Sequence, residues 1–211
     1  MKFPVDAYVL ALGGGFLAAA GSLPLWRAWC RRGGLVDDPG QRKIHHEPIP
    51  LAGGLAVLTG LLVPLGAAAL VIAGQGLAPA TLAPIEYGWG RRGGQVMILL
   101  LGAIGAVALG WWDDRYELPP AAKLAGQVAI AALVAASGIR ITLFVPNALF
   151  GCTVTVLWLV TLMNACNFMD NMNGLCGGIG VIGAFWFALK AAVAGQFLVA
   201  SIAFLACGAL L

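Results

Sequence analysis

Charged residues are scarce in this chain. Asp, Glu, Lys and Arg make up 10% of its 211 residues, while 61% are hydrophobic and the mean hydropathy is +0.92. A soluble domain carries about 25% charged residues. The apolar segments leave no stretch long enough for a separate soluble domain. The composition therefore excludes an ordinary soluble fold and indicates a polytopic membrane protein.

The sequence also lacks the usual signs of a zinc site, a disulfide framework or a nucleic-acid partner. Its five cysteines form no Cys-x-x-Cys pair, and its two histidines are adjacent at positions 45 and 46. We interpret the cysteines as small buried hydrophobic residues. The net charge of +3 is small, and no basic tract suggests binding to nucleic acid.

Long apolar runs predict an all-α fold with about seven transmembrane helices in a single transmembrane domain, residues 1–211. The expected spans are 5–26, 51–74, 94–112, 121–138, 147–168, 175–194 and 197–211. Glycines spaced as in Gly102-x-x-Gly105 are typical of helices that approach closely in a membrane.

This topology places three polar stretches on one side of the membrane. The stretches 27–50, 113–120 and 169–174 follow the first, third and fifth spans, so they share a side. The first two are rich in Lys and Arg, which favours the cytoplasm for this side and an external N-terminus.

The first polar stretch contains a basic loop. Arg42, Lys43 and His45 lie between turn-forming prolines, and Gly53-Gly54 opens the next span with little side-chain bulk. Arg and Lys side chains that converge in this way can bind a phosphate. The alternative is a basic loop that only sets the orientation of the protein in the membrane.

The second polar stretch contains adjacent carboxylates, Asp113 and Asp114, followed by Arg115 and Lys123. The aspartates follow the C-terminal end of a predicted helix, where the helix dipole disfavours negative charge. Two carboxylates about 5 Å apart repel each other by roughly 3 kcal/mol at an effective dielectric constant of about 20. A divalent cation or a bound proton would relieve both effects. The alternative is a solvated acidic end to the span, with Arg115 as the counter-charge.

The third stretch is rich in carboxamides. Asn164, Asn167, Asp170, Asn171 and Asn173 lie at the end of a hydrophobic run, and most recur every three or four positions. On a continuous helix this spacing places them on one face, which can hold a cation and bind a polar ligand. The alternative is hydrogen bonding between helices, a common role of Asn in membranes.

Together the three stretches suit a Mg²⁺-assisted reaction of a phosphate or pyrophosphate. Mg²⁺ typically binds one or two carboxylates together with substrate phosphates. The apolar scaffold suits a lipid-borne substrate whose head group meets a cytosolic one at the interface. Two other classes remain open: a secondary transporter, because intramembrane Asn and Asp also mark ion pathways, and an inactive fragment or scaffold subunit.

The three stretches resemble motifs of the polyprenyl-phosphate N-acetylhexosamine-1-phosphate transferases, which include the phospho-N-acetylmuramoyl-pentapeptide transferase. The first motif is Arg-Lys-x-His-x-x-Pro-x-Pro…Gly-Gly, here Arg42 to Gly54. The second is Asp-Asp…Leu-x-Pro…Lys, with Gln127 following, and the third is Asn-x-x-Asn-x-x-Asp. The first loop is more similar to the branch that transfers N-acetylglucosamine-1-phosphate.

The resemblance implies transfer of a sugar-1-phosphate, N-acetylglucosamine-1-phosphate in that branch, from a UDP-N-acetylhexosamine to undecaprenyl phosphate in the bacterial plasma membrane. UMP leaves, and the active face is cytoplasmic. The product initiates synthesis of cell-wall or surface polysaccharide. The cofactor is Mg²⁺, with Mn²⁺ as an alternative. A homodimer is the default expectation for assembly.

The resemblance also implies roles for individual residues. The catalytic residues would be Asp113 and Asp114, and the metal ligands would be Asn167, Asp113 and Asp114. Phosphate groups would be bound by Arg42, Lys43, His45 and Lys123. The nucleotide sugar would be bound by Asn164, Asp170 and Asn173.

The sequence departs from the family pattern in three places. Asn171 and Asn173 stand where the family usually has Gly and Asp, and Leu51 stands where an Arg often follows the first motif. Family members also carry further spans, a later Gly-Asp motif that binds Mg²⁺ and a His-rich loop. We therefore expect a C-terminally truncated chain that is inactive on its own.

Overall fold

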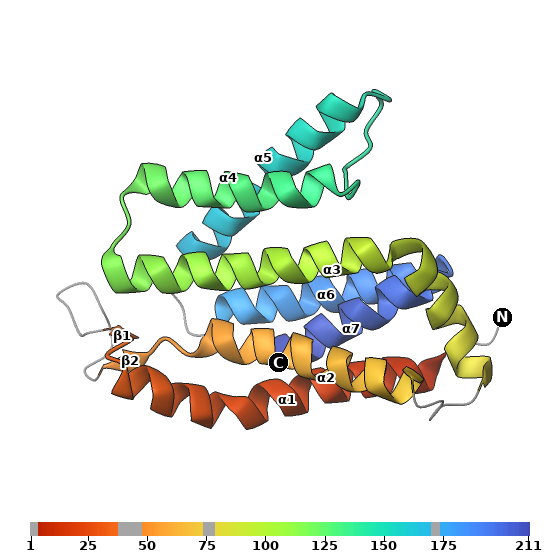
Figure 1. Cartoon of the computed structure of the whole chain (residues 1–211), viewed down its shortest axis with the longest axis horizontal. Helices are drawn as coiled ribbons and strands as arrows, with labels where there is room; N and C mark the ends of the chain where they lie inside the picture. The colour runs from red at the N-terminus through yellow and green to blue at the C-terminus, as the bar shows by residue number, and fades with distance from the viewer. Residues whose placement is uncertain (1–3, 38–47, 74–78, 170–173) are drawn as a thin grey trace. The chain divides into compact units, whose positions relative to one another are not determined.

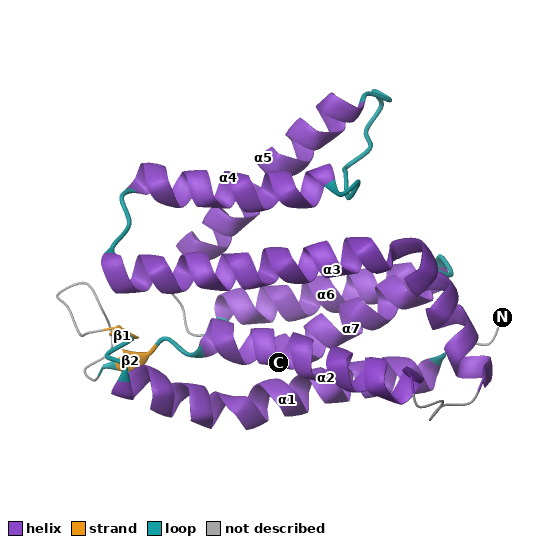
Figure 2. Cartoon of the chain, viewed as in Figure 1, coloured by secondary structure: helices purple, strands orange, loops and turns teal. Residues whose placement is uncertain are grey.

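The computed structural model describes residues 4–37, 48–73, 79–169 and 174–211. Within these ranges the chain is almost entirely helical, as Figures 1 and 2 show. The elements in chain order are α1 (Val5–Arg32), β1 (Val36–Asp37), β2 (Ile49–Pro50), α2 (Gly53–Ala73), α3 (Pro79–Tyr116), α4 (Pro120–Ala136), α5 (Ala148–Met169), α6 (Leu175–Val193) and α7 (Phe197–Leu210).

The all-α prediction is confirmed. Five helical segments are long and apolar enough to cross a membrane, in α1, α2, α3, α5 and α6. The other two described helices, α4 and α7, are apolar but shorter. The protein is a multi-pass membrane protein.

Helix α3 is longer than the span expected over 94–112. It has 38 residues and begins at Pro79. No proline lies between Pro84 and Pro119, so every residue in that stretch has the backbone N–H that a helix interior requires. This allows the helix to begin well before residue 94, but it does not account for the part before Pro84.

A short antiparallel ribbon, absent from the sequence prediction, joins α1 to α2. Val36 pairs with Pro50 and Asp37 with Ile49. Leu35 and Ala52, which flank the ribbon in sequence, are buried together with Cys30 of α1. The ribbon brings together the two ends of the loop that contains Arg42, Lys43 and His45, three residues that lie outside the described ranges.

The chain divides into two compact units. Unit 1 comprises residues 1–88 and 177–211, and unit 2 comprises residues 89–176. In unit 1, α1, α2 and α7 pack against one another. Its core is rich in alanine, namely Ala188, Ala191, Ala192, Ala200 and Ala203, with Tyr8 and Phe204.

Two backbones in unit 1 approach so closely that only glycine fits. A Cβ atom at Gly208 of α7 would lie 2.8 Å from the carbonyl carbon of Leu12 in α1, and one at Gly15 would collide with the backbone of Leu205. Small residues allow this approach, which is how many membrane helices associate.

Unit 2 consists of the greater part of α3 with α4 and α5. A Cβ atom at Gly102 of α3 would lie 3.2 Å from the Val134 side chain of α4, and one at Gly105 would lie 3.4 Å from the Ile130 side chain. These glycines therefore meet side chains of α4 rather than its backbone. The carboxamide oxygen of Asn147 accepts hydrogen bonds from the N–H groups of Leu149 and Phe150 at the start of α5. An Asn at this position satisfies N–H groups that have no partner within the helix.

Candidate functional site

The turn between α3 and α4 determines which side chains meet at this end of unit 2. Helix α3 ends at Tyr116 because Glu117 adopts a left-handed conformation, with φ of 48°. The Glu117 N–H still donates to the Asp113 carbonyl, at 2.8 Å. Pro119 is extended and Pro120 begins α4, a position that suits proline. The chain therefore reverses within a few residues.

This reversal brings Lys123 to Asp113. The Lys123 Nζ lies 2.7 Å from the Asp113 Oδ2, and the two side chains are 30% and 21% exposed. An ammonium group at this distance offsets the unfavourable helix dipole at the carboxylate. Lys123 thus provides Asp113 with a partner from the next helix.

Asp114 lies in a different environment from Asp113. It is exposed, whereas Asp113 is half-buried. Neighbouring residues on a helix diverge by about 100° around its axis, so the two side chains leave the helix in different directions. The predicted catalytic pair is therefore asymmetric, with Asp113 as the member that faces α4.

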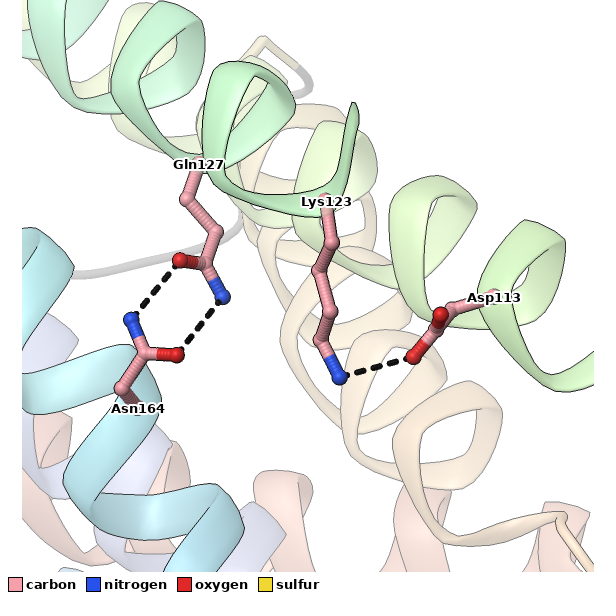
Figure 3. A network of polar contacts seen from close by, with 4 residues as sticks. All are labelled: Asp113, Lys123, Gln127 and Asn164. Atoms are coloured by element: carbon pink, nitrogen blue, oxygen red, sulfur yellow. Dashed lines mark hydrogen bonds and ion pairs between the residues drawn. The ribbon is translucent and has the colours of Figure 1, made fainter. Parts of the chain in front are cut away.

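One turn further along α4, Gln127 meets Asn164 of α5 (Figure 3). The Asn164 Nδ2 donates to the Gln127 Oε1 at 2.8 Å, and the Gln127 Nε2 donates to the Asn164 Oδ1 at 3.5 Å. The Asn164 Nδ2 also donates to the Val160 carbonyl at 2.8 Å. Gln127 is buried, with 5% of its surface exposed.

Asn167 lies one turn beyond Asn164 and is exposed near the end of α5. The spacing of three residues places the two carboxamides on neighbouring positions of one helix face. Asp170 and Asn173, the other predicted nucleotide-sugar residues of this stretch, lie outside the described residues.

The structure thus brings parts of two predicted polar stretches together. Asp113 and Lys123 from the second stretch, and Asn164 from the third, are linked through α4. Gln127 follows the second motif in the sequence, but no role was predicted for it. The available signal was its position four residues after Lys123 on an otherwise apolar helix, which places both on one face.

The predicted metal ligands are Asp113, Asp114 and Asn167, whose side chains all offer oxygen atoms. Among the described residues, no three His, Cys, Asp or Glu side chains gather to hold a metal ion. Asp113, Asp114 and Asn167 offer two carboxylates and a carboxamide oxygen. Such donors fit Mg²⁺, which needs few protein ligands when substrate phosphates complete its shell.

The model of glycosyl transferase family 4 matches residues 96–211, more than half of the chain. The chain belongs to glycosyl transferase family 4. The matched region includes Asp113, Lys123, Gln127, Asn164 and Asn167.

Several curated relatives are similar over most of this family 4 chain. It is 30% identical over 177 residues to the probable undecaprenyl-phosphate N-acetylglucosaminyl 1-phosphate transferase of Bacillus subtilis, covering 80% of this chain and 44% of the relative. It is 31% identical over 163 residues to the decaprenyl-phosphate N-acetylglucosaminephosphotransferase of Mycolicibacterium smegmatis, covering 72% of this chain and 37% of the relative.

A third relative is the undecaprenyl-phosphate alpha-N-acetylglucosaminyl 1-phosphate transferase of Yersinia pestis, 27% identical over 71% of this chain and 38% of its own length. The chain therefore spans less than half the length of these relatives. No solved structure matches it significantly.

Proposed function

We propose that this chain belongs to an enzyme that transfers N-acetylglucosamine-1-phosphate from a UDP-sugar to undecaprenyl phosphate and releases UMP. The observation that carries the proposal is the Asp113–Lys123 pair at the end of two apolar helices, inside the family-matched region. A carboxylate and an ammonium group at this place suit two phosphate substrates that meet at a membrane surface. The names of the relatives support both the lipid acceptor and the sugar phosphate.

Asp113 and Lys123 would act on the phosphates directly. When a phosphate enters, it can replace Asp113 as the partner of the Lys123 ammonium group, because both are anions that accept its hydrogen bonds. The released Asp113 carboxylate could then orient the lipid phosphate or accept its proton. The exposed Asp114 would assist from the adjacent position.

Mg²⁺ would be held by Asp113, Asp114 and Asn167, with Mn²⁺ as an alternative. The ion would neutralise charge on the pyrophosphate and on the departing UMP. From the family resemblance we assign phosphate binding also to Arg42, Lys43 and His45, and nucleotide-sugar binding to Asp170 and Asn173. The resemblance implies nucleotide-sugar binding for Asn164 as well. We place the active face at the cytoplasmic side of the bacterial plasma membrane, where the reaction would initiate polysaccharide synthesis.

The test is UMP release by the complete product of the coding frame, purified in lipid nanodiscs with UDP-N-acetylglucosamine, undecaprenyl phosphate and Mg²⁺. We expect Asp113→Asn to lower turnover by about 100-fold or more, as loss of a general base or charge-stabilising group does. Glu86→Gln is the matched control, since it removes an exposed carboxylate from the other end of α3.

Normal rates in both Asp113→Asn and Asp114→Asn would contradict the catalytic assignment. Uptake of a solute into proteoliposomes without UMP release would instead support a transporter.

A further inference from the structure

We propose that Gln127 and Asn164 form an amide pair that positions Asn167 and Lys123, and that Asn164 acts through this pair rather than by contacting the nucleotide sugar. The inference rests on the proposed function, because it concerns the same site. It makes Gln127 a positioning residue and changes the role that the resemblance gives to Asn164.

The hydrogen bonds of Asn164 leave its amide group committed to the protein. Its Nδ2 carries two hydrogens, and it donates to the Gln127 Oε1 and to the Val160 carbonyl, both at 2.8 Å. The Asn164 Oδ1 accepts from the Gln127 Nε2. A substrate that used the Asn164 N–H groups would first have to break a bond to a buried glutamine, which would leave polar groups unsatisfied.

The position of the pair explains what it orders. On α4, Gln127 lies four residues after Lys123, and on α5, Asn164 lies three residues before Asn167. Each member is therefore one helical turn from a predicted ligand-binding side chain on its own helix. The pair joins the two helices directly beside the site.

The surrounding contacts between α4 and α5 cannot do this alone. Apart from Gln127 and Thr155, the buried residues of α4 and α5 are small or apolar, namely Ala131, Val134, Ala135 and Gly151. Such contacts set the distance between helices but have little preference for rotation about the helix axis. Two opposed carboxamides hydrogen-bond in one relative orientation, so they restrict that rotation.

A second polar contact secures the opposite end of the same two helices. The buried Thr155 Oγ1 accepts the N–H of Ile141, just after α4, at 2.8 Å. It lies more than two turns before Asn164 on α5. Thr155 therefore offers a matched control: its loss weakens the same unit without releasing the end that carries Asn167.

The experiment uses electron paramagnetic resonance to measure Mn²⁺ binding to the complete product of the coding frame in lipid nanodiscs. The variants are Gln127→Leu, Asn164→Leu, Thr155→Val and the exchanged double variant Gln127→Asn/Asn164→Gln, which keeps two carboxamides and the summed side-chain length. We expect either Leu variant to weaken Mn²⁺ binding by about 10- to 100-fold, the range for residues that orient metal ligands. The double variant Gln127→Asn/Asn164→Gln should restore most of the Mn²⁺ affinity, and Thr155→Val should leave the Mn²⁺ affinity unchanged.

Three results would overturn the inference. Wild-type Mn²⁺ affinity in Asn164→Leu is the first. Equal weakening in Thr155→Val is the second, because it would show general destabilisation. The third is weaker UDP-N-acetylglucosamine binding in Asn164→Leu but not in Gln127→Leu, which would show direct contact with the nucleotide sugar.

Hydrogen exchange of residues 165–169 separates failure of this inference from failure of the proposed function. If the chain without substitutions binds no Mn²⁺, the assignment of the metal ligands fails. Hydrogen exchange then tests by itself whether the amide pair orders the end of α5. Both Leu variants should then exchange about tenfold faster than Thr155→Val over these residues, because local order at the end of a helix sets its exchange rate. Unchanged exchange would refute the role of the pair.

Discussion

Units 1 and 2 hold their helices together in different ways. In unit 1, α1 and α7 approach through Gly15 and Gly208, and alanines dominate the core. One side-chain hydrogen bond, from the Trp26 Nε1 to the Thr59 Oγ1 at 2.9 Å, joins α1 to α2. In unit 2, glycines of α3 meet side chains of α4, and α4 is linked by polar side chains to both neighbours, through Lys123 to α3 and through Gln127 to α5.

The difference shows what each kind of contact can provide. Lipid tails are as apolar as the helix surfaces, so membrane helices associate through close packing and hydrogen bonds. Close packing of small residues provides stability without reactive groups. Ion pairs and amide pairs add orientation, and they lie where the proposed chemistry needs fixed side chains.

The largest effect on stability should come from breaking the close packing of unit 1. Gly208→Ala should lower the free energy of unfolding by about 2–3 kcal/mol, the upper part of the range for overpacking, because the new Cβ would collide with the Leu12 backbone. Gly183→Ala in α6 is the control, since a Cβ there meets no atom within 4 Å. Thermal unfolding in nanodiscs should separate the two variants; equal stability would show that the helices can move apart freely.

A smaller effect should follow from removing a polar contact of unit 2. Thr155→Val leaves the Ile141 N–H without its acceptor, so we expect a loss of about 1–2 kcal/mol. Thr153→Val is the matched control, because Thr153 is exposed and donates only to the carbonyl of Leu149 in its own helix. Chemical unfolding of the two variants measures the difference, and a Thr153→Val loss as large as that of Thr155→Val would remove the special role of the Ile141 contact.

The smallest stability effect should come from the ion pair. Lys123→Gln should change the free energy of unfolding by less than about 1 kcal/mol, because the pair is partly exposed to solvent. Turnover of the complete enzyme should nevertheless fall, since the ammonium group is assigned to phosphate. Lys190→Gln, at an exposed position of α6, is the control. Full activity in Lys123→Gln would show that the pair is only structural.

The sequence alone predicted the class of fold and much of the candidate site. Its apolar runs predicted an all-α membrane protein, which the helices confirm. The order of Asp113, Lys123, Asn164 and Asn167 carried the family resemblance, which the family match confirms. The roles assigned to these four residues remain predictions.

Other features could not be predicted from local pattern. Lys123 forms an ion pair with Asp113, although the two residues lie ten positions apart on different helices. That pairing depends on the left-handed Glu117 and the two prolines after it, which bring α4 back beside α3. The β1–β2 ribbon and the extension of α3 to Pro79 were likewise not expected.

Composition and spacing by themselves determined that this chain is a helical membrane protein with polar residues at the ends of its spans, because burial in lipid demands long apolar helices and tolerates polar groups only at particular places. Tertiary structure alone decided which of those polar residues are partners. Gln127 and Asn164 are 37 positions apart in sequence, and only the packing of α4 against α5 brings their side chains within hydrogen-bonding distance.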